Sequence, residues 1–161
     1  MSSRLLASAR AVLALASSLL ALEAHAQTLV VTDDAHVRTQ TPRWTDGDGP
    51  ALVVRATDNP QRAFVRFDLS ALPSAAMVAR ATLRLWVDDV GAAGAVNVRV
   101  VAGPWSEATL NALGAPALSW SVGKIAITPQ SAGHYALLDV SDVVQDWIDH
   151  QSPNHGLALL P

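Results

Sequence analysis

The sequence predicts an all-β fold, an antiparallel sandwich or barrel of short strands with one short helix near residues 142–150. From Thr28 onward, β-branched and apolar runs are broken by turn-forming residues about every ten positions. Several runs alternate apolar with polar residues, the period of a strand that buries one face. This rhythm is typical of a sandwich or barrel rather than of repeated βαβ units.

Separate segments of the chain have the composition of strands. They are residues 28–32, 35–40, 51–57, 62–69, 80–88, 95–102, 117–128, 134–140 and 156–160. The sequences between them, most clearly residues 44–50, 58–60 and 72–74, are rich in residues that favour turns or block sheet pairing.

One helix is predicted to begin near Ser141 and Asp142 and to end at Asp149 or His150. Gln145 follows Asp142 by three residues, as in a capping box. The apolar residues of this segment recur at helical spacing and share one face, which comprises Val143, Val144, Trp147 and Ile148. We expect this face to pack on a sheet edge.

The final segment, residues 156–160, has the composition of a buried strand, and no partner strand follows it in the sequence. A hydrophobic strand beside an open sheet edge is an aggregation risk. We therefore expect a sandwich that lacks its closing strand, in a chain that is truncated at its C-terminus or pairs this strand with a second copy.

Residues 1–26 have the three zones of a secretory signal peptide. Arg4 and Arg10 precede an apolar run over residues 11–22, and the sequence Ala24-His25-Ala26, with small residues at 24 and 26, suits signal peptidase. The run is too short to span a bilayer as a helix, so we expect no membrane span after cleavage. The predicted product is a secreted, extracellular or surface-bound domain of residues 27–161, and an uncleaved anchor is the alternative.

The composition of the chain argues against several classes of function. The chain has 11 basic and 14 acidic residues, and cleavage before Gln27 removes two of the former and one of the latter. An acidic balance argues against nucleic acid as a partner. The absence of cysteine excludes disulfides, thiolate metal sites and cysteine nucleophiles, so stability must come from packing, with or without a bound ion.

Side chains alternate between the two faces of a strand, which separates an inward from an outward set. The inward apolar set is Val65, Phe67, Leu69, Leu83, Leu85, Val87, Val96, Val98 and Val100. The outward set then includes Phe64, Val101, Trp86 and three arginines, Arg66, Arg84 and Arg99. If their strands are adjacent in one sheet, the arginines form a basic stripe with Phe64 and Trp86 beside it.

Such a stripe would suit an acidic polysaccharide. An arginine fork binds carboxylate or sulfate, and an aromatic ring stacks on a sugar face. Trp44, in a polar loop, is expected to be an exposed ring that also contacts ligand, whereas Trp105, Trp120 and Trp147 are expected in the core or against the helix. The alternative is an ordinary solvated sheet face whose arginines pair with nearby carboxylates.

The sequence does not favour an enzyme. The histidines after residue 26 are scattered, and neither a zinc-protease motif nor a nucleophile elbow is present. Glu107 is the one glutamate after residue 26, although aspartate pairs remain open as the two acids of a glycosidase. Four aspartates, Asp33, Asp34, Asp48 and Asp58, are candidate ligands for a structural calcium ion, with solvated turn aspartates as the alternative.

Five stretches in this order resemble the DNRLRE-domain family, also described as carbohydrate-binding module family 96. They are residues 34–38, 64–70, 81–87, 105–107 and 138–147. The resemblance implies a jelly-roll-like β-sandwich in an exported protein, often appended to a polysaccharide lyase or another surface protein, with alginate-type binding in some members. The chain departs from the family in residues 109–113, where a threonine-tryptophan-asparagine stretch is usual, and after Leu160.

Taken together, residues and resemblance predict a secreted, non-catalytic module that binds an extracellular polysaccharide, with an acidic glycan as the expected partner. A structural or adhesive surface module without a glycan ligand is the alternative, and a hydrolase or lyase is a third class.

Overall fold

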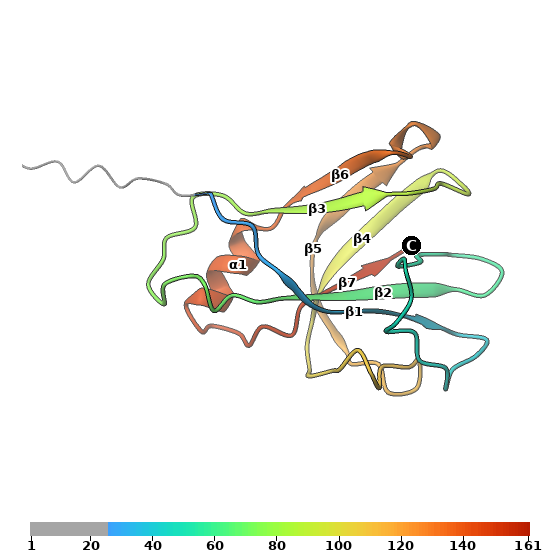
Figure 1. Ribbon diagram of the computed structural model, residues 1–161, viewed down its shortest axis with the longest axis horizontal. Helices are drawn as coiled ribbons and strands as arrows, with labels where there is room; N and C mark the ends of the chain where they lie inside the picture. The colour runs from blue at the N-terminus through green and yellow to red at the C-terminus, as the bar shows by residue number, and fades with distance from the viewer. Residues whose placement is uncertain (1–25) are drawn as a thin grey trace, which may run out of the picture.

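A computed structural model describes residues 26–161, so the predicted signal peptide, apart from Ala26, lies outside the described residues. The described chain is an all-β sandwich, as predicted (Figure 1). Its strands are β1 (Val31–Arg38), β2 (Gln61–Phe67), β3 (Thr82–Val87), β4 (Gly94–Val101), β5 (Leu118–Ile127), β6 (His134–Asp139) and β7 (Leu157–Leu160). A short 3-10 helix, η1 (Pro129–Ser131), precedes β6, and α1 (Ser141–Ile148) follows it.

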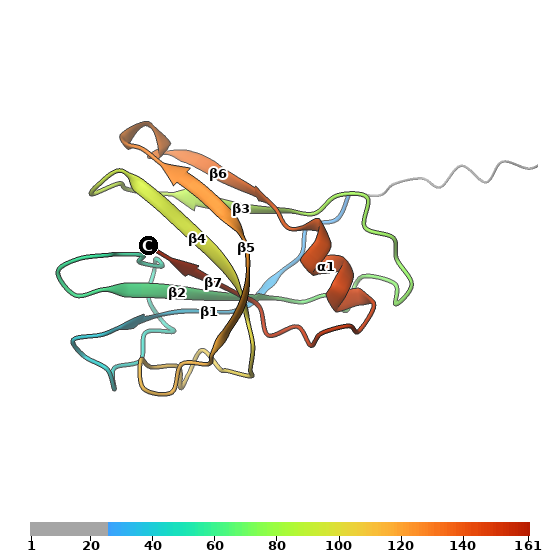
Figure 2. The ribbon, with the colours of Figure 1, turned by 180° about the vertical axis from the view of Figure 1, so that it is seen from behind.

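The strands form two antiparallel sheets. One is a five-stranded sheet of order β1-β2-β7-β4-β5, and the other is a two-stranded ribbon of β3 and β6. Figures 1 and 2 show β5 beside β6, although the two strands belong to different sheets. In both views α1 lies at one end of the sandwich. Among residues 26–161, no helix has the length and apolar composition needed to cross a membrane.

The main core lies between the two sheets. Val65 of β2, Leu83 of β3 and Val98 of β4 are buried there, so the predicted inward set is confirmed at these positions. The predicted helix and its apolar face are confirmed as well, because Val143, Val144, Trp147 and Ile148 all belong to this core. Burying such side chains is the main force that holds the ribbon and helix on the larger sheet.

A second core covers the opposite face of the five-stranded sheet. Phe64 and Val101, predicted to point to solvent, are fully buried there with Trp105 and Leu110. The loop between β4 and β5 supplies this cover and appears in yellow and orange below β1 and β2 in Figure 1. The assignment of these two positions to an outward face was wrong because the sheet is covered on both sides, which strand alternation alone does not reveal.

The last strand is not at an open edge. β7 lies in the middle of the five-stranded sheet, paired with β2 on one side and β4 on the other. Gly156 enters the strand with a positive φ of 83°. The expected unpaired edge beside residues 156–160 is therefore wrong, and the apolar composition of β7 reflects a strand that is covered by core on both faces.

Other boundaries differ from the predictions. Parts of the segments 28–32 and 35–40 join in one strand, β1, which covers Val31–Arg38 and has a bulge between Val31 and Asp33. Residues 51–57 form no strand in the structure and make only an isolated bridge between Arg55 and Gln61, because Pro50 and Pro60 interrupt pairing on both sides. Trp120, expected in the core, is 43% exposed on β5.

The predicted capping box at α1 does not form, since the N-cap position is Val140, which has no side-chain acceptor, and the Ser141 amide donates to Asp139 Oδ1 instead. The amide of Gln145 is used elsewhere. Its Oε1 accepts a hydrogen bond from the Val78 amide at 2.8 Å, and its Nε2 donates to the Ala76 carbonyl at 3.2 Å. Gln145 thus ties the loop before β3 to the helix.

Candidate functional site

The outer face of the β3–β6 ribbon carries large exposed side chains. Arg84 is paired with Leu137 in the ladder, and Trp86 is paired with Tyr135. Because the inward positions of both strands pack on the core, these four side chains point to solvent. Trp86, Tyr135 and Leu137 are 55%, 51% and 57% exposed, a large apolar display for a surface strand pair.

Arg84, Trp86 and Tyr135 form a contiguous unit that we call the aromatic platform. The rings of Trp86 and Tyr135 meet edge to face, with centroids 5.1 Å apart and planes at 72°. The Arg84 guanidinium carbon lies 4.3 Å from the centroid of the Tyr135 ring, in cation–π range. These contacts hold the three side chains in one arrangement before any ligand arrives, which lowers the entropy cost of binding.

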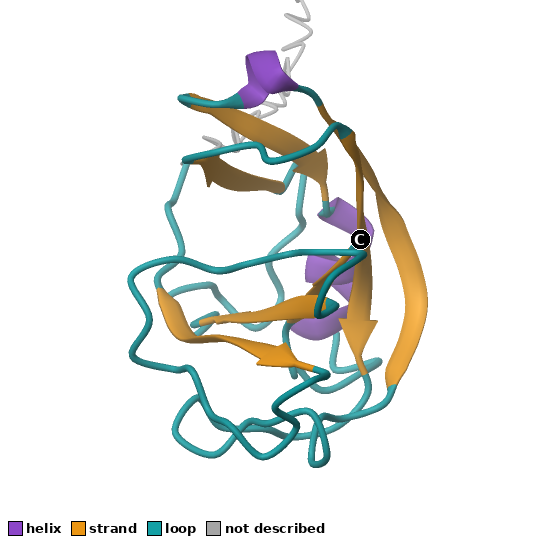
Figure 3. Ribbon diagram, turned by 90° about the vertical axis from the view of Figure 1, so that its right-hand side faces the viewer, coloured by secondary structure: helices purple, strands orange, loops and turns teal. Residues whose placement is uncertain are grey.

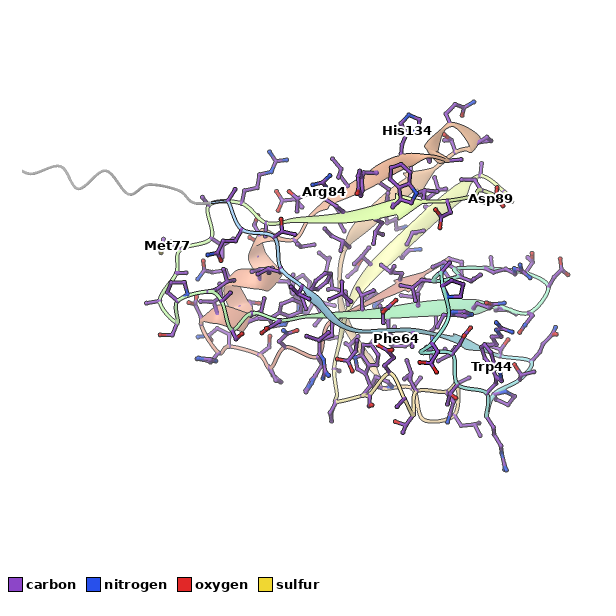
Figure 4. All side chains as sticks on the ribbon, viewed as in Figure 1. Trp44, Phe64, Met77, Arg84, Asp89 and His134 are labelled. Carbon is purple, nitrogen blue, oxygen red and sulfur yellow. The ribbon has the colours of Figure 1, made fainter. Side chains whose placement is uncertain are left out.

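Apart from its contact with the Tyr135 ring, the charge of Arg84 has no partner, and no carboxylate among residues 26–161 neutralises it. Within residues 26–161 its guanidinium makes no hydrogen bond or ion pair, and Figure 4 shows the side chain directed away from the core. A guanidinium in this position has donors free for a carboxylate or a sulfate. The platform therefore combines flat apolar area with a free, fork-shaped cation.

The predicted basic stripe does not exist as such. Arg66 is on β2 and Arg99 on β4, which β7 separates, and Arg84 is in the other sheet. Arg66 is held by Asp33, whose Oδ2 accepts from its Nε at 3.0 Å and from its Nη2 at 2.5 Å. The prediction of adjacent strands was wrong because these strands are consecutive in sequence but not neighbours in space.

Arg99 is also engaged by its own sheet. Its Nε donates to the carbonyl oxygen of Ser119 at 3.0 Å, and Nη2 donates to the same oxygen. The register of β4 against β5 shifts on both sides of Arg99, so this side chain satisfies a carbonyl at an irregular point of the ladder. Of the three predicted arginines, Arg84 alone lies in the aromatic platform.

Trp44 is exposed as predicted, at 38%, and lies far from the platform, in the loop after β1 (Figure 4). The Arg38 guanidinium carbon stacks over its ring at 3.7 Å, so part of the indole is already covered. Asp46 in the same loop contacts Arg38 at 3.1 Å and the buried His36 at 2.8 Å. Burial lowers the pKa of His36 despite the opposing charge of Asp46. Trp44 thus belongs to a group of contacts with Arg38 that holds this loop against β1.

The four predicted calcium ligands are not brought together. Within the described part of the chain, no three His, Asp or Glu side chains form a group that could hold a metal ion. Asp33 is bound to Arg66, whereas Asp58 lies in a turn with a positive φ of 50°. The grouping of Asp33 and Asp34 with Asp48 and Asp58 was wrong, because β1 and two separate loops carry them.

Asp33 and Asp34 have opposite electrostatic environments. Burial opposes ionisation of Asp33, but hydrogen bonds from Arg66, Thr32 and the Glu107 amide outweigh it and keep its pKa below the ordinary value. Burial raises the pKa of Asp34, and the charges of Glu107 and Asp33 act in the same direction. The Asp34 amide donates to Oε2 of Glu107 at 3.0 Å, which fixes the loop carrying that glutamate.

Tyr135 and Leu137 were not identified as site residues from the sequence. A signal was present, because Ala136, Leu138 and Val140 form the inward set of their segment and leave positions 135 and 137 on the outside. What the sequence did not show is that this strand pairs with the one carrying Trp86.

A sandwich that presents exposed rings and an arginine without an anionic partner on one ribbon has the kind of surface that ligand-binding β modules use. The particular family is carbohydrate-binding module family 96, to which the chain belongs: its sequence matches the family model over residues 25–160. The resemblance found from the sequence is thereby confirmed. No curated protein matches the sequence.

Proposed function

We propose that this protein is an exported, non-catalytic module that binds an acidic extracellular polysaccharide on the aromatic platform. The observation that carries the proposal is the exposed Trp86–Tyr135 pair with Arg84 over the tyrosine ring. Membership of a carbohydrate-binding module family supports a glycan as the ligand class.

The chemistry of the platform suits a charged sugar. The apolar faces of sugar rings pack on aromatic rings, and the T-shaped pair offers two differently oriented surfaces. The guanidinium of Arg84 supplies the fork that pairs with a carboxylate or sulfate. A neutral glucan would use the rings and leave the cation without a partner, so we expect weaker binding to it.

The platform supports binding rather than catalysis. Its side chains are an arginine, a tryptophan and a tyrosine, whereas glycoside hydrolysis typically uses two carboxyl groups across the scissile bond. We therefore expect acidic polysaccharides to be bound without being shortened.

Affinity electrophoresis tests this function. The purified protein is run through native gels that contain alginate, pectate, a sulfated glycan or a neutral glucan. Retardation by the acidic polymers, with weak or no retardation by the glucan, is the expected result. Free migration in every gel would contradict the proposal and favour the structural or adhesive surface module.

Export rests on residues 1–26 and has its own test. We expect a host that secretes the protein to release a form whose N-terminal residue is Gln27, and N-terminal sequencing identifies it. A product that keeps residues 1–26 and stays with the membrane fraction would show an uncleaved anchor.

Structural calcium stays a prediction, because aspartates remain on the surface even though the four predicted ligands are apart. An ion that binds only the folded state raises the melting temperature. Calorimetry in calcium and in chelator tests whether the folded protein binds calcium. Equal melting temperatures in the two solutions would contradict a structural calcium ion.

A further inference from the structure

We infer that the groove at the seam of β5 and β6 is a second subsite, which binds an anionic group on a sugar unit beside the one held by the aromatic platform. This inference rests on the proposed function and extends the glycan-binding surface beyond the aromatic platform. The groove, called here the Lys124 groove, has a volume of about 440 Å³. Its lining includes Lys124, Thr128, Gln130, Ser131, His134 and Tyr135.

The two strands approach closely enough to make one outer surface. A Cβ added at Gly123 of β5 would lie 2.9 Å from the Leu138 Cδ1 of β6, so glycine makes room for this side chain on the inner face. Lys124, next in the strand, takes the opposite face. Tyr135 borders the groove and is also part of the platform, so the two surfaces are continuous.

The groove supplies a cation that no other group uses. Lys124 is the single lysine of the chain. Its side chain is exposed and makes no ion pair within residues 26–161. An ammonium in such a place acts as a mobile point charge for an anion.

Hydrogen-bonding groups line the same groove. His134, labelled in Figure 4, is the first residue of β6, and its Nδ1 donates to the Ala132 carbonyl at 2.9 Å. This bond orients the ring and leaves Nε2 as the atom for a ligand. The amide of Gln130 in η1 makes no hydrogen bond in the described part of the chain and is exposed. Together these groups suit the hydroxyls and the anionic substituent of one sugar unit.

Arg84 on β3 and Lys124 on β5 then flank the Tyr135 strand from opposite sides. A glycan that reaches both cations must lie across the strands and carry anionic groups on more than one unit. Linked contacts of this kind strengthen binding through effective concentration. Oligosaccharides long enough to reach both should therefore bind more tightly than single charged sugars.

The single lysine makes a direct test possible. Reductive methylation with ¹³C-formaldehyde labels the Lys124 amine and keeps its charge. The Lys124→Gln variant identifies the lysine signal beside that of the N-terminal amine. The intact labelled protein is titrated with oligogalacturonates, sulfated oligosaccharides or neutral gluco-oligosaccharides. Because the chain has five tryptophans, the fluorescence change that is absent from a parallel titration of Trp86→Phe reports on the platform.

We expect the Lys124 methyl signal to shift with an anionic oligosaccharide and to stay in place with the neutral one. A response to uronates alone identifies carboxylate as the anion, and a response to sulfated chains alone identifies sulfate. We expect Lys124→Gln to weaken binding of the anionic oligosaccharide by about two- to fivefold. Arg55→Gln, which removes the same charge from an exposed residue between β1 and β2, should leave affinity unchanged.

A Lys124 signal that stays fixed while the fluorescence of the platform saturates would overturn the subsite and leave the proposed function intact. An equal shift with the neutral oligosaccharide would overturn the anionic character of the groove. Absence of both the fluorescence and the methyl response with every sugar would contradict the proposed function itself.

Discussion

Trp86 and Tyr135 lie opposite each other in the β3–β6 ladder, with ring centroids 5.1 Å apart and about half of each side chain open to solvent. An aromatic pair of this geometry is worth about 0.5–1.5 kcal/mol beyond area burial, and more apolar area would be removed from water if the rings faced the core. The outer position of both rings thus favours recognition over packing. Figure 3 shows the ribbon that carries them as a layer apart from the larger sheet.

Gly156 is expected to be indispensable to the larger sheet. A Cβ at this position would lie 3.0 Å from the Cα of Arg66 and closer still to the Val65 carbonyl oxygen, at a φ of 83°. Gly156→Ala must therefore move β7 away from β2, and we expect it to lower the free energy of unfolding by about 2–4 kcal/mol. Urea denaturation measures the loss. Gly91→Ala is the matched control, because nothing lies within 4 Å of its added Cβ.

Asp34 should destabilise the folded protein at neutral pH. Burial, followed by the charges of Glu107 and Asp33, raises its pKa, so the folded state binds a proton here more tightly than the unfolded state does. The penalty is present above the folded pKa and is relieved as the pH falls through it. We expect Asp34→Asn to raise the melting temperature at pH 7, with the gain shrinking in acid. A lower melting temperature at pH 7 would contradict this assignment.

The neighbouring Asp33 should behave in the opposite way. Although burial opposes its charge, the hydrogen bonds led by Arg66 lower its pKa, so its contribution to stability is present above the unfolded pKa and is lost as the pH falls through the folded pKa. We expect Asp33→Asn to lower the melting temperature at pH 7, because Arg66 loses its anionic partner. Differential scanning calorimetry of both variants from pH 7 to acid compares them, and equal effects would refute the contrast.

Gln145 is expected to couple the helix to the loop before β3. Gln145→Ala leaves the Val78 amide and the Ala76 carbonyl without their side-chain partner, at an expected cost of about 1–3 kcal/mol in unfolding free energy. Gln151→Ala, at an exposed position just beyond α1, should change stability by less than about 0.5 kcal/mol. Chemical denaturation of the two variants distinguishes them, and equal costs would show that the bonds of Gln145 contribute nothing.

The sequence predicted the local pattern well and the neighbours of each strand poorly. Strand alternation predicted the burial of Val65, Leu83 and Val98, and the apolar face of residues 143–148 predicted the helix. Both predictions succeeded because each signal lies within a single element. Phe64 was misplaced because its cover comes from a loop that begins after Val101. β7 was misplaced because pairing on both sides of a strand depends on topology, which no local pattern encodes.

The same limit applies to the site. Arg84 and Trp86 were found because an outward arginine and an outward ring are visible in one strand. Tyr135 and Lys124 are far along the chain from Arg84 and Trp86. The β3–β6 pairing brings Tyr135 beside them, and the contact of β5 with β6 adds Lys124 to the same surface. Arg66 was a candidate on the same grounds as Arg84, but it lies in the other sheet and is bound to Asp33.

Affinity electrophoresis in an acidic polysaccharide tests the platform most directly. It compares the Trp86→Ala and Trp44→Ala variants with the unaltered protein. Both residues are exposed tryptophans, but only Trp86 belongs to the platform. We expect Trp86→Ala to lose retardation while its melting temperature stays within a few degrees of the original, and Trp44→Ala to keep retardation. Retained binding by folded Trp86→Ala together with lost binding by Trp44→Ala would place the glycan on the Trp44 loop and contradict the assignment.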